Sequence, residues 1–176
     1  MKNLIGILLM ISLGFCNNIT STIINTKIDF YINKYSKKYQ LEPAFVKAFC
    51  RQESRLKPYC IRYEKHLHTN KSYCGLMTEK EKRDKLSYCS LGLMQILFGT
   101  AKERGFKGTP EDLLKIENSL EYGIRHLKWL IRRFWELKDV ISAYNQGSPR
   151  KKNGKYCNQS YVDNVLKYYN LYSIPK

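Results

Sequence analysis

Apolar residues recur along this chain at spacings of three and four positions, which places them on one face of a helix. We expect helices over residues 28–39, 44–54, 91–100, 119–137, 139–144 and 161–171. No segment alternates between apolar and polar residues for long enough to predict a strand. The sequence therefore predicts a mainly α fold, and about 150 residues are enough to form one core.

The first residues have the pattern of an export signal. Lys2 precedes an apolar run from Leu4 to Phe15, which is too short to span the roughly 30 Å of a bilayer core as a helix. A short basic region followed by a short apolar region is typical of a secretory signal. Because Phe15 is bulky, we do not expect Cys16 to carry a lipid. We predict a signal peptide over residues 1–18, one domain over residues 19–176, and a periplasmic or extracellular location.

The formal net charge is +16. Such a charge favours anionic partners, namely nucleic acid, acidic membrane surfaces or an acidic cell-wall polymer. Charge alone does not choose among these three partners.

Export also bears on the cysteines, because an exported chain meets an oxidising environment. Cys50 falls inside an apolar helical stripe, so we expect it to be a buried free thiol. Four others could form two disulfides in any of three pairings: Cys60, Cys74, Cys89 and Cys157. Three of these lie in residues 55–90, where no helical period is sustained. Long connections of this kind tend to be functional or cross-linked.

One carboxylate lies on an apolar helical face. Glu53 follows Phe49 by four positions and Cys50 by three, so it projects from the same stripe. Burial there would raise the pKa of Glu53, which is what a general acid needs near neutral pH. Periodicity alone leaves an alternative, in which Glu53 turns into solvent at the helix end or pairs with Arg51 or Arg55.

No other motif supplies a competing chemistry. The chain has no Gly-rich phosphate loop followed by Lys, and no His-Glu-x-x-His pair. The spacing of His66 and His68 from the cysteines matches no common zinc site. We therefore expect no metal and no cofactor. We interpret His126, on a helix flank, as a surface or packing residue.

Four short motifs follow one another with plausible gaps: Glu53-Ser54, Gly92-Leu93-Met94-Gln95-Ile96, Ala143-Tyr144-Asn145-Gln146-Gly147 and Tyr161-Val162. Together, over roughly residues 40–170, they resemble the ordered signatures of the soluble lytic transglycosylase domain. The resemblance implies a lysozyme-like helical fold with a glycan-binding cleft. In such a fold the cysteine-containing segment would be a long loop after the catalytic helix.

The resemblance also implies an activity. Family members cut the β-1,4 bond between N-acetylmuramic acid and N-acetylglucosamine and leave a 1,6-anhydro sugar. By this resemblance Glu53 is the single general acid and base, and the hydroxyl of Tyr144 hydrogen-bonds it. The positions implied to contact the glycan are Ser54, Met94, Gln95, Tyr144 and Asn145. From the residues alone, Tyr144 and Met94 also fit roles in the core.

The segment between Glu53 and Gly92 resembles variants found in phage and prophage enzymes. We expect it to edge the cleft, which makes Glu64 a candidate second carboxylate. If Glu64 reaches the far face of the sugar, hydrolysis becomes the alternative activity, as in goose-type lysozymes. A non-catalytic peptidoglycan-binding protein is a third hypothesis.

The expected partner is the peptidoglycan glycan strand, since an acidic wall polymer would explain both the basic charge and the buried acid. We expect no nucleic-acid partner. We also expect peripheral attraction to anionic membranes and a monomeric state.

Overall fold

The structure, a computed structural model, describes the backbone of residues 2–174 and the side chains of residues 20–174. Helices make up 66% and strands 8% of the residues described in full, which confirms the prediction of a mainly α fold. The predicted signal peptide over residues 1–18, and Cys16 with it, lie outside the residues described in full. Within the described part, no helix has an apolar stretch long enough to cross a membrane.

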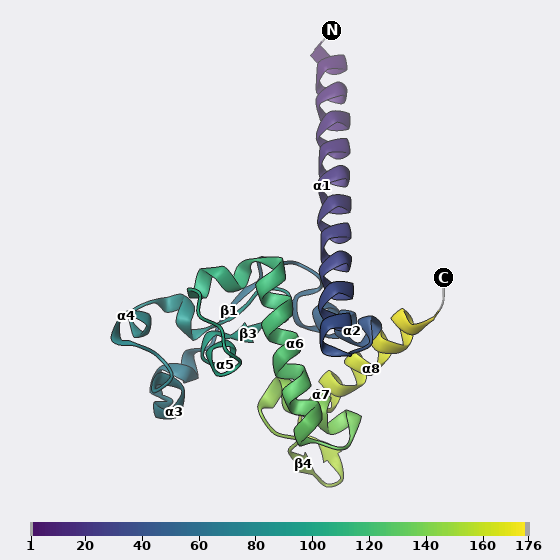
Figure 1. The fold of residues 1–176 in the computed structure, drawn as a ribbon. Helices are drawn as coiled ribbons and strands as arrows, with labels where there is room; N and C mark the ends of the chain where they lie inside the picture. The colour runs from purple at the N-terminus through teal and green to yellow at the C-terminus, as the bar shows by residue number, and fades with distance from the viewer. Residues whose placement is uncertain (1, 175–176) are drawn as a thin grey trace.

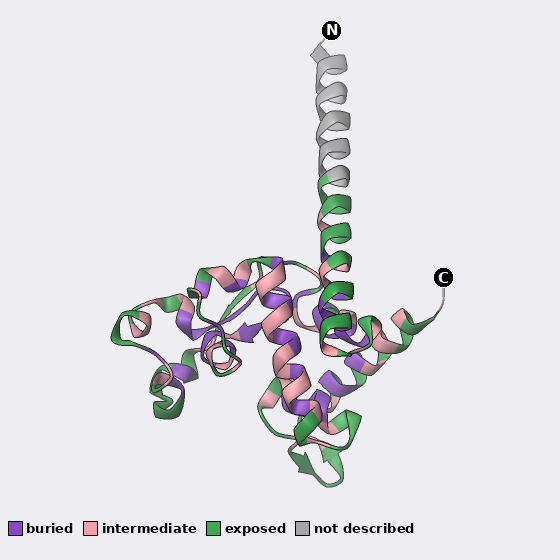
Figure 2. Ribbon diagram, in the orientation of Figure 1, coloured by how far each residue is buried: buried purple, intermediate pink, exposed green. Residues whose placement is uncertain are grey.

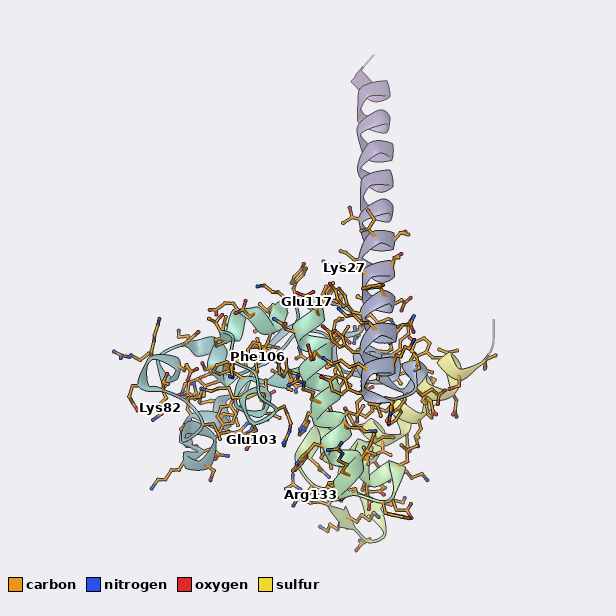
Figure 3. The ribbon with its side chains drawn as sticks, in the orientation of Figure 1. Lys27, Lys82, Glu103, Phe106, Glu117 and Arg133 are labelled. Carbon is orange, nitrogen blue, oxygen red and sulfur yellow. The ribbon has the colours of Figure 1, made fainter. Side chains whose placement is uncertain are left out.

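Five helices build the larger part of the molecule: α1 (Lys2–Tyr39), α2 (Pro43–Ser54), α6 (Ile116–Arg133), α7 (Leu137–Gln146) and α8 (Gln159–Ser173). Figure 1 shows α6 crossing the middle of the molecule, and α2 packs chiefly against α8 while α1 packs against α6. Tyr31 on α1 donates a 2.6 Å hydrogen bond to Glu117, which is labelled at the start of α6 in Figure 3. Helices were predicted at each of these places, although α1 begins well before residue 28.

The helix that carries Glu53 has clear start and stop signals. Pro43 occupies its first turn, where a backbone N–H would have no hydrogen-bond acceptor within the helix, so proline costs nothing there. At its end Arg55 adopts a left-handed conformation, with φ of 56°. There the N–H groups of Arg55 and Leu56 bond back to carbonyl groups of the last turn. Glu53 is therefore held on a complete last turn rather than on a frayed end.

The apolar faces of the five helices meet in one core, which we call the helical core. Figure 2 shows buried residues, in purple, along α6. The largest fully buried side chains of this core include Phe49, Leu120, Ile124 and Leu127. Phe49 comes from α2, and the other three lie on one stripe of α6, at the spacing that the sequence predicted. Burial of these stripes supplies the main favourable free energy for holding the helices together.

A second, smaller part of the molecule consists of short elements: β1 (Ile61–Tyr63), η1 (Lys65–Thr69), α3 (Lys71–Cys74), α4 (Glu79–Lys82), η2 (Lys85–Tyr88), β2 (Cys89–Leu91), β3 (Ile96–Leu97), α5 (Phe98–Glu103) and η3 (Pro110–Leu114). The three strands form an antiparallel sheet in the order β1-β2-β3, with Arg62 opposite Ser90. These elements bury their own cluster, here called the sheet core, around Leu91, Phe98 and Leu113.

Three expectations about the short elements were wrong. No strand was predicted, yet the chain forms this sheet and a hairpin of β4 (Lys151–Lys152) and β5 (Lys155–Tyr156). Strands of two or three residues are too short to show an alternating pattern. The helix expected over residues 91–100 begins only at Phe98, because residues 89–97 enter the sheet. Residues 55–90, expected to be a long loop, contain five short elements and the start of β2.

The predicted disulfides are absent from the described residues, where Cys60, Cys74, Cys89 and Cys157 are all free thiols. A disulfide requires two Cβ atoms about 3.5–4.5 Å apart and facing each other. The thiols instead donate to nearby backbone carbonyl groups: Cys60 to Ser54, Cys74 to Leu67 and Cys89 to Lys85. Cys157 is exposed directly after the β4–β5 hairpin. Cys50 is the buried free thiol that was predicted.

Candidate active site

An open cleft of about 150 Å³ lies between the helical core and the sheet core. Its lining comes from both parts of the molecule: Glu53, Arg62, Glu64, His66, Ser90, Gln95, Ile96, Leu97, Thr100, His126, Tyr144 and Asn145. Most of these side chains are polar, which suits a ligand that carries many hydrogen-bonding groups.

Glu53 reaches this cleft from the last turn of α2. Protein atoms surround most of its carboxyl group, although part of the residue stays open to the cleft. Burial raises the pKa of Glu53 to about 7, against the opposing effects of a hydrogen bond from Tyr161 and the charge of Arg62. The negative charge of Glu64 adds to the rise. Near neutral pH a large fraction of Glu53 is therefore protonated and able to give up a proton.

The hydrogen bond to Glu53 comes from Tyr161, in the first turn of α8, over a donor–acceptor distance of 2.5 Å. Burial and then the nearby Glu53 raise the pKa of Tyr161 well above its usual range, so the tyrosine keeps its proton and remains the donor. The extensive packing of α8 on α2 brings the two side chains together. The tyrosine fixes the orientation of the carboxyl group in the cleft.

Tyr144 lines the same cleft as Glu53 but does not make the expected hydrogen bond. Its hydroxyl donates to the backbone carbonyl of Met94 at 2.9 Å, and its ring packs on Phe49 with centroids 4.8 Å apart. The implied hydrogen bond from Tyr144 to Glu53 is therefore wrong for this structure. The physical reason is that the hydroxyl of Tyr144 is already committed to the Met94 carbonyl.

The turn over residues 92–95 is docked closely on α6. Gly92 has φ of 72°, and a Cβ atom there would lie 2.5 Å from the Ser119 hydroxyl oxygen. That hydroxyl accepts a hydrogen bond from the N–H of Met94. Gly92 is therefore required for two reasons: its backbone is left-handed, and it lies too close to Ser119 for a Cβ atom to fit. The turn fixes Gln95, whose amide donates to the carbonyl groups of Gly92 and Cys60.

The sheet supplies the other wall of the cleft. Glu64 accepts hydrogen bonds from Arg62 at 2.7 Å and from Ser90 at 2.9 Å, and His66 lies 3.9 Å from it. Partial burial works against ionisation of Glu64, but these two hydrogen bonds outweigh it and lower the pKa of Glu64. Two carboxyl groups thus share the cleft with pKa values displaced in opposite directions, which is typical of sites for acid–base chemistry.

A model of the transglycosylase SLT domain family matches residues 30–165, which span every element of this cleft. The chain belongs to this family. No curated protein and no solved structure matches the chain. Membership in the family supports a lytic transglycosylase that acts on peptidoglycan. It also accounts for the order of the four motifs along the sequence.

Of the predicted site residues, this SLT domain brings Glu53, Gln95, Tyr144 and Asn145 together in the cleft, with the candidate Glu64. The other two lie elsewhere. Ser54 is 3% exposed and donates to the Cys50 carbonyl within its own helix.

Met94 is fully buried. Its side chain packs against α6 so closely that a Cβ at Gly123 would lie 2.6 Å from it. Met94 thus contributes to the site through its backbone carbonyl.

Several residues around the cleft of the SLT domain were not predicted from the sequence as members of the site, and three of them bear on its chemistry: Tyr161, Ser90 and His126. Tyr161 was noted only as part of a motif, and nothing in the sequence indicates that its hydroxyl reaches Glu53. Ser90 sits in a strand too short to predict. His126 was interpreted as a surface or packing residue, yet it lines the cleft. Its position on the same helix as Leu120 and Ile124 does not indicate that it faces the cleft, because it lies at the edge of the buried stripe.

Proposed function

We propose that this SLT domain cleaves the β-1,4 bond between N-acetylmuramic acid and N-acetylglucosamine, with Glu53 as its only acid and base. Protonated Glu53 gives its proton to the glycosidic oxygen, and the bond to the anomeric carbon breaks. Glu53, now a carboxylate, takes the proton of the muramyl C6 hydroxyl while that oxygen attacks the anomeric carbon. The product is a 1,6-anhydro sugar, and Glu53 returns to its starting state.

The observation that carries this proposal is the state of Glu53. A carboxyl group with a pKa of about 7, oriented by Tyr161 in an open polar cleft, can donate a proton and then accept one at neutral pH. A single group that acts twice needs a pKa near the working pH, because both of its forms must be accessible. No second acid is required, since the substrate supplies its own nucleophile.

The products should have the mass of anhydro-muramyl fragments. When purified sacculi are digested and the soluble fragments are weighed by mass spectrometry, each fragment should be lighter by one water than its hydrolysed counterpart. A digest with Glu53→Gln, which should release almost no fragments in the same time, controls for contaminating enzymes. Fragments carrying an added water would contradict the anhydro product.

Hydrolysis is the second candidate, and the position of Glu64 favours it. Glu64 lines the same cleft, is held by Arg62 and Ser90, and has a lowered pKa. An ionised carboxylate beside a protonated one is the arrangement with which inverting glycosidases activate water. The hydrated fragments described above would be the signature of this activity, and they should then disappear in Glu64→Gln.

The activity should fall above about pH 7, because the general acid must be protonated. The ratio kcat/KM should decrease by roughly ten-fold for each further pH unit, as Glu53 loses its proton. The hydrogen bond from Tyr161 lowers the pKa of Glu53, so Tyr161→Phe should raise this pKa and move the decrease to higher pH. Tyr144→Phe is the matched control, since the Tyr144 hydroxyl bonds Met94 instead. A profile unchanged in Tyr161→Phe would contradict the proposed role of this hydrogen bond.

We also propose that the domain acts outside the cytoplasm as a monomer. Its proposed substrate lies there, and the N-terminal sequence has the pattern of an export signal. The net charge of +16 would attract the acidic wall and, more weakly, anionic membranes.

A further inference from the structure

His126 is a titratable side chain of the cleft that the proposed chemistry leaves without a role. It comes from the middle of α6, on the side of the cleft formed by the helical core. Its ring stacks on Trp129 with centroids 5.8 Å apart and packs at a tilt against Tyr144 at 5.4 Å. His126 is also one of the residues that line the cleft. The ring is therefore packed against two aromatic rings, while part of the residue stays accessible from the cleft.

Arg104, which follows α5, determines which ring nitrogen carries the proton. Its Nε–H donates a long hydrogen bond of 3.5 Å to Nδ1 of His126. An arginine is always a donor, so Nδ1 must be the acceptor and the ring proton must reside on Nε2. Arg104 is itself held, because its guanidinium lies 4.1 Å from the ring centroid of Trp129 and 3.6 Å from Glu103.

The same surroundings keep His126 uncharged. Burial and then the nearby Arg104 lower the pKa of His126 to about 4. The ionisable groups of the other elements that form its surroundings are Arg104, Tyr144, Glu53, Arg62, Glu64 and His66. At neutral pH the ring is therefore a neutral donor, and with Nδ1 occupied it has no free basic nitrogen. This excludes His126 as a general base beside Glu53.

We propose that His126 is a sugar-binding residue, whose Nε2–H donates a hydrogen bond to an oxygen of the glycan while Arg104 fixes the opposite nitrogen. The acceptor is a hydroxyl or an N-acetyl carbonyl oxygen of the amino sugar, since both are neutral acceptors that suit a neutral donor. The inference rests on the proposed function, because it takes the cleft to be the glycan site. It adds a contact that the four motifs do not contain.

Two substitutions separate the hydrogen bond from the packing of the ring. His126→Phe keeps an aromatic ring in contact with Trp129 and Tyr144 but has no hydrogen-bond donor. His126→Gln keeps an N–H donor that can reach about the same place as Nε2. Both are made in the Glu53→Gln background, and the probe is an oligomer of N-acetylglucosamine, whose binding is followed by calorimetry. Thermal unfolding of each variant reports on the fold.

His126→Phe should raise the Kd of the oligomer by about three- to ten-fold, which is the usual contribution of one neutral hydrogen bond. His126→Gln should restore the Kd to within about two-fold of that of the parent, with unfolding temperatures alike in all three proteins. An unchanged Kd in His126→Phe would overturn the inference. So would an equal loss of binding in both variants, since that would point to a structural role for the ring.

Failure of this inference is distinguishable from failure of the proposed function. If the Glu53→Gln parent still degrades sacculi, the proposed function is wrong, whatever the oligomer does. If that parent is inactive and His126→Phe binds the oligomer as tightly as the parent, only the assignment of His126 is wrong.

Discussion

Glu53→Gln should lower the turnover of purified sacculi by about 10²–10⁴-fold, which is the usual contribution of a general acid and base. The amide cannot donate a proton to the glycosidic oxygen, and it cannot take one from the C6 hydroxyl. Release of soluble fragments, followed over time, measures the loss. Because both chemical steps depend on this one side chain, we expect a value at the upper end of the range.

The fold and the binding of sacculi should survive this substitution. Glutamine has the shape of glutamate, and its amide oxygen can still accept the hydrogen bond from Tyr161. Glu79→Gln is a matched control, since Glu79 is an exposed residue of α4 paired with Lys82, away from the cleft. It should cleave at the parent rate. Full turnover in Glu53→Gln would end the proposal that Glu53 is the catalytic acid.

Gly92→Ala should destabilise the protein by roughly 2–5 kcal/mol. The left-handed backbone at this position costs about 1–2 kcal/mol for any residue with a Cβ, and overpacking costs about 1–3 kcal/mol more. The clash is severe, because the new Cβ would lie 2.5 Å from the Ser119 hydroxyl oxygen and 2.6 Å from the Leu113 carbonyl oxygen. Urea unfolding of the parent and the variant gives the difference in free energy.

Gly154→Ala separates the two contributions. Gly154 also has a left-handed backbone, with φ of 75°, but a Cβ there would meet nothing within 4 Å. Its substitution should cost only the conformational part, about 1–2 kcal/mol. If the two alanine variants were destabilised equally, the close docking of the 92–95 turn on α6 would not be an important source of stability.

The helices that form the helical core could be predicted because each buries a stripe long enough to reveal its period. α6 shows Leu120, Ile124 and Leu127 at successive turns, and the prediction of its core face is confirmed. The sheet could not be predicted, because its strands are two or three residues long and their burial depends on neighbours that come from elsewhere in the chain. The family could be recognised from four motifs in order, which do not depend on the packing.

The side-chain partners within the site were harder to predict than its location. Tyr144 and Tyr161 both belong to the motifs, and only the packing of α7 and α8 decides that Tyr161 is the one whose hydroxyl reaches Glu53. The four cysteines form an even set, but a count contains no information about the direction in which each thiol points. Met94 could line a sugar or fill a core. Its burial follows from the absence of a side chain at Gly123, a residue far away in the sequence.

The turn over residues 92–95 joins the two cores. Leu91 and Ile96 belong to the sheet core, while Leu93 and Met94 belong to the helical core. Residues 55–60 and 104–115 also connect the sheet half to the helices, so a tilt of the sheet half would bend all three connections. The carbonyl oxygen that accepts the Tyr144 hydrogen bond belongs to this turn, whereas Glu53 and Tyr161 lie on α2 and α8 in the helical half. A change in the width of the cleft would therefore move the wall formed by the sheet and leave the hydrogen bond from Tyr161 to Glu53 unchanged.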